Sequence, residues 1–267
     1  MTIGIIVSTY NNPEWLRKTL FGYTLQTVMP DEVVVADDGS TSETRDLIDQ
    51  FRDRLPIKHV WHEDRGFQKS EILNKAIAAS TSDYLIFTDQ DCVPRRDFIA
   101  THKALARKGQ YLSGGYFKLN RKISTQLTAA DIAEQTPFSV RWLLGQGQQL
   151  AFKMTKLLKS PLFSKLMNLI TPRAATFNGC NSSCWRQDAI AVNGFDEEMH
   201  YGGQDREFGL RLKNSGIKPK QVAYSAIVLH LDHDRPYKTP ETMRKNRAIM
   251  RDTVRNKRVR ADLGIEK

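Results

Sequence analysis

The sequence predicts an α/β protein with a doubly wound, mostly parallel sheet and helices on both faces. Two observations carry this prediction. Over residues 3–89, short apolar runs alternate with longer segments of helical periodicity, which is the pattern of parallel strands joined by crossover helices. Polar clusters directly follow three of the apolar runs. Ligands of doubly wound sheets bind beyond the carboxyl ends of the strands, so these clusters mark a candidate site.

The elements follow one another in a regular order. Strands are predicted at 3–8, 33–36, 57–61 and 84–87, and helices at 13–26, 41–51 and 70–79. The first helix illustrates the reasoning. Pro13 suits a first helical turn, and Leu16, Leu20 and Tyr23 recur on one face.

The net charge of +10 is unevenly distributed. Residues 139–173 contain six Lys or Arg and no acid, and leucines recur between the lysines at helical spacing. This pattern predicts a basic amphipathic helical pair, whose second helix begins at Ser160 and Pro161. Residues 235–267 contain eleven Lys or Arg against four Asp or Glu. The rest of the chain is therefore mildly acidic, and this asymmetry suggests a partner surface separate from the chemical site.

Cysteine usage and hydropathy indicate a cellular compartment. Cys92, Cys180 and Cys184 are odd in number and scattered, which favours buried free thiols in a reducing compartment. The first residues lack the charged lead and cleavage site of a signal peptide. No apolar run approaches the ~18–20 residues that span a bilayer. We therefore expect a cytoplasmic protein.

The triplet Asp89-Gln90-Asp91 follows the fourth predicted strand. Two carboxylates so placed offer hard oxygen ligands, which suit Mg²⁺ or Mn²⁺ with positions left open for phosphate oxygens. A solvated turn is the alternative, because Asp-x-Asp also occurs by chance in loops. The position of the triplet at a strand end favours the metal site.

Two further motifs combine acidic residues with glycine. Asp37-Asp38-Gly39-Ser40 ends the second strand; its carboxylates suit nucleobase NH groups or ribose hydroxyls, and a plain turn before a helix is the alternative. Gly202-Gly203-Gln204-Asp205 precedes a predicted helix. There the double glycine permits close backbone approach to a ligand, and Asp205 suits a general base. An acid that faces the helix dipole is the alternative for Asp205.

Taken together, these motifs resemble the family 2 glycosyltransferases. The resemblance rests on four motifs in order: Val7-Ser8-Thr9-Tyr10-Asn11, Asp37-Asp38-Gly39-Ser40, Asp89-Gln90-Asp91, and Asn193-Gly194-Phe195-Asp196 leading to Gly202-Gly203-Gln204-Asp205. Their order and spacing match from residue 3 to about 235. The later part also resembles bacterial chondroitin-type polymerase domains and animal β-1,4-galactosyltransferases. The resemblance implies a GT-A fold and an inverting transfer from a nucleotide sugar, usually a UDP-sugar, to a glycan or lipid-linked glycan acceptor in surface polysaccharide or lipopolysaccharide synthesis.

The same resemblance implies roles for individual residues. It assigns Thr9, Asp37 and Arg65 to the nucleoside, Asp89 to the ribose and the surroundings of the metal, and Asp91 to Mn²⁺ or Mg²⁺. A downstream histidine completes the metal site in these relatives, and His230 is our first choice with His233 second.

On the acceptor side, the resemblance makes Asp205 the catalytic base and places Gly203 and Gln204 beside the donor or acceptor sugar. Relatives often carry Glu where this chain has Gln204, which can still donate and accept hydrogen bonds but has no charge. The departure therefore bears on sugar specificity more than on activity.

The resemblance also implies a domain organisation. We expect a transferase domain at 1–235, with a nucleotide-binding half at 1–115 and an acceptor-binding half at 116–235 that includes the basic insert. A basic helical tail follows at 236–267. For the insert, an acceptor-side lid, an anionic membrane surface and a packed helix with solvated lysines remain open. Membrane contact corresponds to peripheral attachment at the inner face of the cell membrane.

Two rival functions deserve comparison. A nucleic-acid-binding module would explain the basic charge, but residues 239–267 lack the aromatic side chains on which bases stack. We therefore expect no nucleic-acid partner. A nucleotidyltransferase would share the layout, but its Gly-rich, Arg-bearing first loop is replaced here by Ser8-Thr9-Tyr10-Asn11-Asn12.

Overall fold

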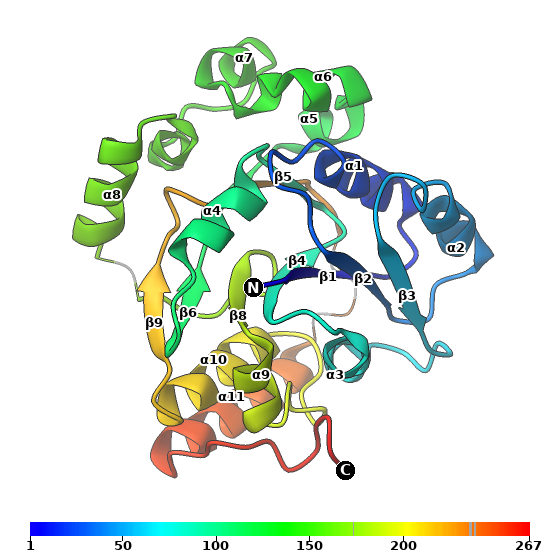
Figure 1. Cartoon of the computed structure of the whole chain (residues 1–267), viewed down its shortest axis with the longest axis vertical. Coiled ribbons are helices and arrows are strands. Elements are labelled where there is room, and N and C mark those ends of the chain that lie inside the picture. Colours follow the sequence, from blue (N-terminus) through cyan, green and yellow to red (C-terminus); the bar gives the residue numbers. More distant parts are fainter. Residues whose placement is uncertain (173, 235–236, 238) are drawn as a thin grey trace.

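The computed structural model describes residues 1–172, 174–234, 237 and 239–267. Arg173, Arg235 and Lys238, which contribute to the two basic segments, lie outside the described residues, as does Pro236. A twisted sheet runs through the middle of the molecule with helices packed on either side of it (Figure 1).

The main sheet has seven strands in the order β3-β2-β1-β4-β8-β6-β9. Its strands are β1 (Ile3–Thr9), β2 (Glu32–Asp37), β3 (Ile57–Trp61), β4 (Tyr84–Asp89), β6 (Gln110–Ser113), β8 (Ser182–Trp185) and β9 (Lys218–Gln221). The first four strands are parallel, and β8 runs antiparallel to both β4 and β6. The chain moves outward from β1 to β3 and then returns to β4 on the other side of β1, which places a topological switch point between β1 and β4.

A smaller sheet in the order β5-β10-β7 packs near the carboxyl end of β4. It consists of β5 (Cys92–Pro94), β7 (Gly115–Lys118) and β10 (Ile227–His230). The pair β10 and β5 aligns His230 with Cys92, so this sheet brings a late segment of the chain beside the acidic triplet.

Helices cover both faces of the main sheet. They are α1 (Pro13–Tyr23), α2 (Ser42–Asp49), α3 (Lys69–Ala79), α4 (Phe98–Leu105), α9 (Arg186–Ala191) and α10 (Gln204–Asn214). Alternate side chains of the strands point to opposite faces. Ile5 and Val7 therefore pack with α1, α2 and α4, whereas Ile6 and Phe87 pack with α3, α9 and α10. This arrangement confirms the predicted doubly wound α/β fold.

A third hydrophobic cluster joins a helical insert to the smaller sheet. The insert contains α5 (Arg121–Gln126), α6 (Ala129–Glu134), η1 (Thr136–Phe138), α7 (Val140–Gly145), η2 (Phe152–Leu157) and α8 (Pro161–Ile170). Buried Phe138, Leu143 and Leu157 pack there with Leu229 of β10. Ser160 caps α8 as expected, accepting a hydrogen bond from Phe163 N at 3.3 Å. The first helix expected in this region is the short 3₁₀ segment η2.

The C-terminal segment contains α11 (Pro240–Arg255), which packs against α10. Asn246 of α11 is fully buried and donates hydrogen bonds to the carbonyl oxygens of residues 200–202. Beyond the helix, Glu266 N donates to Asn193 Oδ1 at 2.8 Å, and Asn193 Nδ2 donates to Ala261 O at 2.9 Å. The segment expected as a tail therefore lies against the loops that carry the motifs at 193–205.

The three cysteines are buried and free, as the sequence predicts. Within the part of the chain that the structure describes, no helix combines the length and apolar character needed to cross a bilayer.

Candidate functional site

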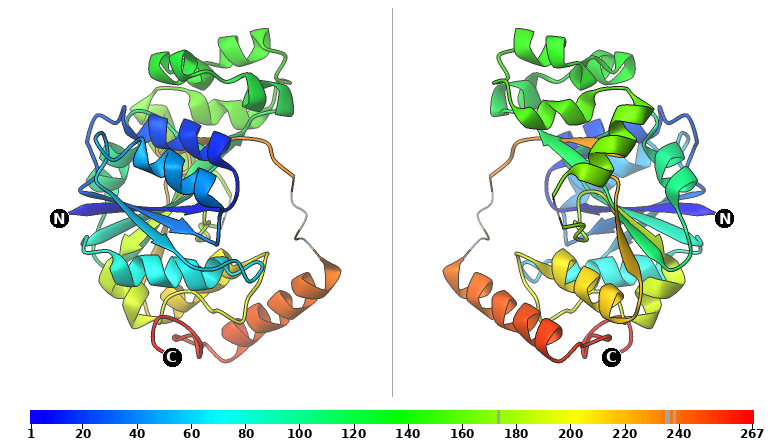
Figure 2. Two further views of the ribbon diagram at one scale, coloured as in Figure 1. Left: turned by 90° about the vertical axis from the view of Figure 1, so that its right-hand side faces the viewer. Right: turned by 90° about the vertical axis from the view of Figure 1, so that its left-hand side faces the viewer.

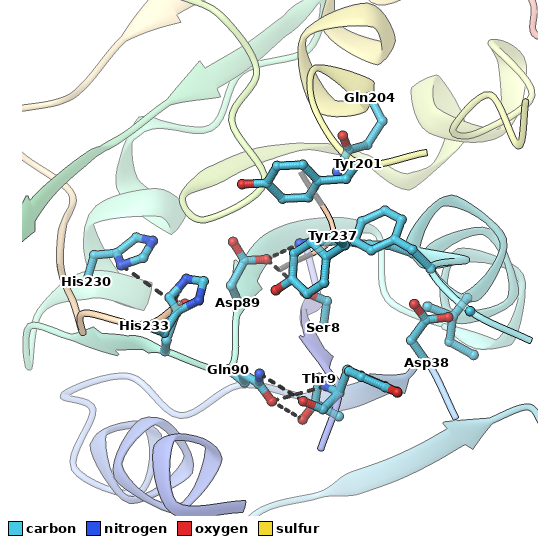
Figure 3. A pocket seen from close by; sticks show the side chains of 16 residues that line it. Ser8, Thr9, Asp38, Asp89, Gln90, Tyr201, Gln204, His230, His233 and Tyr237 are labelled. Atoms are coloured by element: carbon cyan, nitrogen blue, oxygen red, sulfur yellow. Dashed lines mark hydrogen bonds and ion pairs between the residues drawn. The ribbon is translucent and has the colours of Figure 1, made fainter. Parts of the chain in front are cut away.

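A pocket of about 540 Å³ opens at the carboxyl ends of β1 and β4 (Figure 3). Its volume lies within the range of small-molecule sites, ~300–1,000 Å³. The strand ends contribute five of its lining residues, namely Ser8, Thr9, Asp89, Gln90 and Asp91. The pocket therefore occupies the switch point between β1 and β4, where the topology predicts a ligand.

Gln90 connects the ends of β1 and β4. Thr9 Oγ1 and Tyr10 N donate hydrogen bonds to Gln90 Oε1 at 2.6 and 3.1 Å, and Gln90 Nε2 donates to Tyr10 O at 3.2 Å. Because three hydrogen bonds hold the Gln90 amide, this side chain attaches the loop after β1 to the acidic triplet. No sequence pattern had assigned Gln90 a role.

In the acidic pair after β2, Asp38 rather than Asp37 lines the pocket. Asp37 is fully buried and accepts hydrogen bonds from Ser40 N at 2.9 Å and from His59 Nε2 at 2.8 Å. Asp38 is held by His62 Nε2 at 2.7 Å and by Gln68 N at 3.0 Å. Burial raises the pKa of Asp38, and these two donors oppose the shift. Asp37 thus shapes the turn, and Asp38 presents a carboxylate to the pocket.

Lys69, at the start of α3, approaches the acidic triplet. Its Nζ lies 2.5 Å from Asp89 Oδ1, and Ser8 Oγ donates to the same oxygen at 2.7 Å. Burial by itself lowers the pKa of Lys69, but Asp89, followed by Asp205 and Asp91, raises it above its usual value. The ammonium group therefore stays charged inside the pocket.

Arg65 lies outside the pocket lining. Its guanidinium is about half exposed and pairs with Glu71 Oε1 at 3.2 Å. Gly66 and Phe67, the next two residues, do line the pocket, so the loop before α3 contributes backbone and an aromatic ring there.

Asp91 and two histidines form the buried end of the pocket. Asp91 Oδ2 lies 3.5 Å from His230 Nδ1 and 2.9 Å from His233 Nε2. Burial by itself raises the pKa of Asp91, but the nearby His230 and His233 outweigh it and lower the pKa to about 2. The structure therefore brings both histidine candidates to Asp91.

The hydrogen bonds of His233 provide a test of the site for a cation. Its Nδ1 lies 2.7 Å from Asp234 O, a contact that requires the proton on Nδ1. In the neutral ring, the Nε2 lone pair then faces the Asp91 carboxylate at 2.9 Å. Two acceptors at that distance repel each other unless a proton or a cation lies between them, so this geometry fits a bound metal ion.

The nearby donor set supports the same conclusion. Ligand atoms of Asp91, Cys92 and His230 lie within 4.8 Å of one another. Cys92 Sγ donates a hydrogen bond to Asp91 Oδ1 at 3.4 Å, and sulfur ligands favour softer metals than the hard cations expected here. The donors that remain are a carboxylate oxygen and imidazole nitrogens, a set that can hold a divalent metal ion.

Asp205 lies beside Asp89 and Lys69, close to Gly179. A Cβ atom at Gly179 would lie 3.9 Å from each of Asp205 Cβ, Asp89 Oδ1 and Lys69 Nζ, so the three side chains surround one glycine. Gly179 N and Arg206 N donate to the two oxygens of Asp205 at 3.0 and 2.8 Å. Burial raises the pKa of Asp205 despite these two bonds. A fixed carboxylate with a raised pKa has the properties of a general base.

The double glycine contacts α11. A Cβ atom at Gly202 would lie 2.5 Å from Met243 Sδ, and one at Gly203 would lie 3.2 Å from Met250 Sδ. Gly203 is also the N-cap of α10, with φ at 94°. These glycines therefore permit the backbone to approach the methionine side chains of α11, whereas the sequence analysis expected them to permit its approach to a ligand. Gln204 does line the pocket, and its Oε1 accepts a hydrogen bond from Gly202 N at 3.0 Å.

Three aromatic rings gather at the pocket. Phe67 lies 5.6 Å from Tyr201 and 5.3 Å from Tyr237 between ring centroids, and the two tyrosines are 5.0 Å apart. They come from three separate loops. All three line the pocket, so they offer apolar faces opposite its charged floor.

Comparison with known families bears on this site. The family model described as "Glycosyl transferase family 2" matches residues 4–140, just over half of the chain. The chain belongs to glycosyl transferase family 2. A second family model, described as "N-terminal domain of galactosyltransferase", matches residues 168–234. The two matches together cover the strand ends, Asp205 and both histidines, which confirms the resemblance drawn from the motifs.

Curated relatives of this family 2 chain are longer than it is. The validoxylamine A glucosyltransferase of Streptomyces hygroscopicus subsp. limoneus is 28% identical over 252 residues, which cover 88% of this chain and 52% of the relative. The chondroitin synthase of Escherichia coli is 28% identical over 254 residues, which cover 91% of this chain and 36% of the relative. The chain therefore spans about half of the first relative and about a third of the second.

Solved structures share the fold. TarS 1–349 of S. aureus, crystallised with UDP-GlcNAc, has a TM-score of 0.68 at 18% identity and covers 99% of this chain and 68% of that one. The mannosyltransferase PcManGT of Pyrobaculum calidifontis, in complex with GDP-Man and Mn²⁺, has a TM-score of 0.58 at 20% identity over 92% of this chain and 60% of that one. These likenesses confirm the predicted GT-A fold.

The sequence analysis of this family 2 chain anticipated part of the pocket. Among the predicted residues, Thr9, Asp89, Asp91, Gln204 and His230 line it. Asp205 lies at its edge, whereas Asp37, Arg65 and Gly203 are engaged elsewhere, and their predicted ligand contacts stay predictions.

Pocket residues that the sequence analysis missed include Asp38, Gln90, Lys69 and the aromatic trio. A charged residue at the start of a helix gives no sign that it faces a ligand, so Lys69 carried no usable signal. Asp38 was visible as the neighbour of Asp37, but the sequence alone does not reveal which of the two faces inward.

Proposed function

We propose that this chain transfers a sugar from a nucleotide donor, a UDP-sugar, to a hydroxyl group of a glycan acceptor with inversion at the anomeric carbon. The observation that carries this proposal is the convergence of Asp89, Asp91, both histidines and Lys69 on one pocket beside Asp205. Membership of the family supports a glycosyltransferase, and the TarS complex with UDP-GlcNAc supports a UDP-linked donor for the shared fold.

The nucleoside would occupy the end of the pocket between Thr9 and Phe67. Asp38 offers a carboxylate there, held in place by His62. A carboxylate accepts hydrogen bonds from the NH group of a base or from ribose hydroxyls. The aromatic ring of Phe67 suits stacking against a planar base.

The diphosphate would lie over the acidic triplet, where the chain supplies both charge and metal ligands. Asp91, His233 and His230 would hold Mn²⁺, or Mg²⁺, at the buried end. When bound, the ion stabilises the negative charge that develops on the departing nucleoside diphosphate. Lys69, kept charged by Asp89, adds a second positive group on the same side of the pocket.

Asp205 would act on the acceptor. Its two backbone hydrogen bonds fix the carboxylate, and its raised pKa increases its basicity. It takes the proton of the acceptor hydroxyl as the oxygen forms a bond to the anomeric carbon and the bond to the diphosphate breaks. A single displacement of this kind inverts the configuration and requires no covalent enzyme intermediate.

The relatives support a proposed role in polysaccharide assembly. Several of them are chondroitin and hyaluronan synthases, and we propose a glycan acceptor for this chain on that ground. Gln204 and the rings of Tyr201 and Tyr237 are the lining groups that suit sugar hydroxyls and sugar rings.

Nucleotide-sugar binding provides the direct test. We would measure thermal shifts with a panel of UDP-, GDP- and dTDP-sugars, each with Mn²⁺, with Mg²⁺ and with a chelator. We expect stabilisation by UDP-sugars that requires a divalent ion, together with release of UDP when a glycan acceptor is added. Stabilisation by no nucleotide sugar under any of these conditions would refute the proposal.

A further inference from the structure

Helix α8 presents its apolar side to solvent. Leu162 and Leu169 are each 83% exposed, and Leu166 and Ile170 are 52% and 56% exposed. These four residues recur at positions i, i+4, i+7 and i+8 of one helix, so they share one face. Their exposure is unusual, since the apolar face of a surface helix normally packs on the protein core.

The opposite side of α8 carries the polar contacts to the protein. Asn168 Nδ2 donates to Ser225 Oγ at 2.9 Å, and Tyr224 N donates to Asn168 Oδ1 at the same distance. Ser164 is buried on this side, together with the partly buried ring of Phe163. Helix α8 is therefore anchored through its polar residues, and its leucines remain largely exposed, with Leu169 also lining a cavity beside Arg96 and Asp97.

The residues before α8 also expose large apolar side chains. Leu150 is 77% exposed, Phe152 is 71% exposed and Leu158 is 44% exposed. We call these three residues and the four on α8 the apolar ridge. Seven large hydrophobic side chains within 21 residues form a larger exposed patch than isolated surface leucines do, and such patches mark interaction sites.

Within its own segment of the chain the apolar ridge is accompanied by cations and no acids, while Asp97 and Glu134 from other segments line the cavity that Leu158 and Leu169 also line. Lys153, Lys159 and Lys165 are exposed between its apolar residues, and residues 139–173 contain no Asp or Glu. Long lysine side chains can extend their ammonium groups beyond an apolar surface toward anionic groups. The ridge therefore combines the two features of a helix that lies in the plane of a lipid interface.

We propose that the apolar ridge binds the surface of an anionic lipid bilayer, with its leucines among the acyl chains and its lysines at the headgroups. A second copy of this chain fits less well, because a two-fold contact through the ridge would bring two cationic surfaces together. Figure 2 shows the insert helices at one end of the molecule and α11 at the other. Contact through the ridge would therefore leave α11, with its row of exposed arginines, away from the lipid.

The test compares binding of the full chain to vesicles of phosphatidylcholine alone with binding to vesicles that also contain phosphatidylglycerol. We expect sedimentation with the anionic vesicles, weakened by salt because the lysines contribute. The double variant Leu162→Glu/Leu169→Glu should bind at least about tenfold more weakly, since it removes two inserted side chains and adds negative charge. Both positions are exposed, so this variant should retain the wild-type melting temperature.

Val254→Glu is the matched control, because Val254 is 57% exposed on the other basic helix, α11. It should bind the vesicles as the wild type does. Equal vesicle binding by the wild type and the double variant would overturn the proposal, as would loss of binding in the Val254→Glu control alone. A wild-type dimer that becomes a monomer in the double variant would also overturn it, and light scattering without vesicles measures that outcome.

A measurement of nucleotide-sugar binding distinguishes a failure of the lipid-binding proposal from a failure of the proposed activity. The double variant lies outside the pocket, so its thermal shift with a UDP-sugar should equal that of the wild type. Loss of vesicle binding with an unchanged nucleotide shift is the expected pair of results. If the proposed activity is wrong, the wild-type protein itself will show no thermal shift with a UDP-sugar, whether or not it binds lipid.

Discussion

The substitution Asp205→Asn examines the proposed base most directly. Asparagine keeps the size of the side chain but cannot take a proton from an acceptor hydroxyl. General-base catalysis contributes ~10²–10⁴-fold to a rate, so we expect kcat to fall by that factor, or by about 2.7–5.4 kcal/mol of transition-state stabilisation. The donor pocket is formed by other residues, so the affinity for the nucleotide sugar should change little.

The pH dependence gives this prediction a second readout. Because burial raises the pKa of Asp205, the folded chain binds its proton more tightly than the unfolded chain does. Stability from this group is therefore greatest at low pH and declines as pH rises through the raised pKa. The wild-type rate should fall as pH drops through that same pKa, because the base becomes protonated.

The assay is UDP release at saturating donor and acceptor, measured across pH, with the melting temperature as the control for folding. Asparagine is neutral at every pH, so the variant should lack the acidic limb of the wild-type profile and should not be much less stable at neutral pH. An Asp205→Asn enzyme with nearly full activity and an unchanged acidic limb would refute the reasoning.

Other substitutions test the metal, the donor loop and the core. Asp91→Asn should abolish the Mn²⁺-dependent part of the UDP-sugar thermal shift, because it weakens the only carboxylate that faces both histidines in the described part of the chain; an unchanged shift would exclude Asp91 as a ligand. Gln90→Leu removes the acceptor of Thr9 and Tyr10 and should raise the donor KM about thirtyfold, given ~1 kcal/mol for each of the two lost bonds, whereas an unaltered KM would show that the loop after β1 keeps its position without Gln90. Glu207→Gln breaks the fully buried pair with Arg211, so urea unfolding should reveal a loss of ~3–5 kcal/mol in the free energy of unfolding; a loss below about 1 kcal/mol, the value of an exposed pair, would contradict this expectation.

The sequence predicted the first half of the fold closely because each element there has its own local signal. The apolar run at 84–87 becomes β4, which extends to Asp89, and the helix predicted at 70–79 begins one residue earlier, at Lys69. The insert was harder to predict. Leucine spacing near 150–158 indicated a helix, but the structure forms the short 3₁₀ segment η2 there, and spacing alone does not distinguish the two.

The candidate site likewise contains residues that were predictable from the sequence and residues that were not. Residues at strand ends were predictable, because parallel strands place their carboxyl ends at one edge of the sheet. Contacts between distant segments were not. The pairing of Lys69 with Asp89, and of Met243 with Gly202, depends on how helices pack on the sheet, and neither residue has a local pattern that reveals its partner.

The sequence analysis left the orientation of α8 open between inward packing and contact with a membrane surface. Its leucines and lysines were recognised as an amphipathic pattern, and such a pattern normally implies that the leucines pack inward. The hydrogen bonds of Asn168 to residues 224 and 225 reverse that orientation. One asparagine whose partners lie far along the chain therefore decided which side of the helix meets solvent.

The single amide of Asn246 makes the C-terminal helix a part of the active site's framework. It joins α11 to the three consecutive carbonyls of residues 200–202, just before α10 and Asp205, and the final residues bond in turn to Asn193. A chain cut after residue 239 would retain every side chain proposed to touch the substrates. It would nevertheless lose the hydrogen bonds that set the position of Tyr201 and the start of α10. We therefore expect such a fragment to lose more of its turnover rate than of its affinity for the nucleotide.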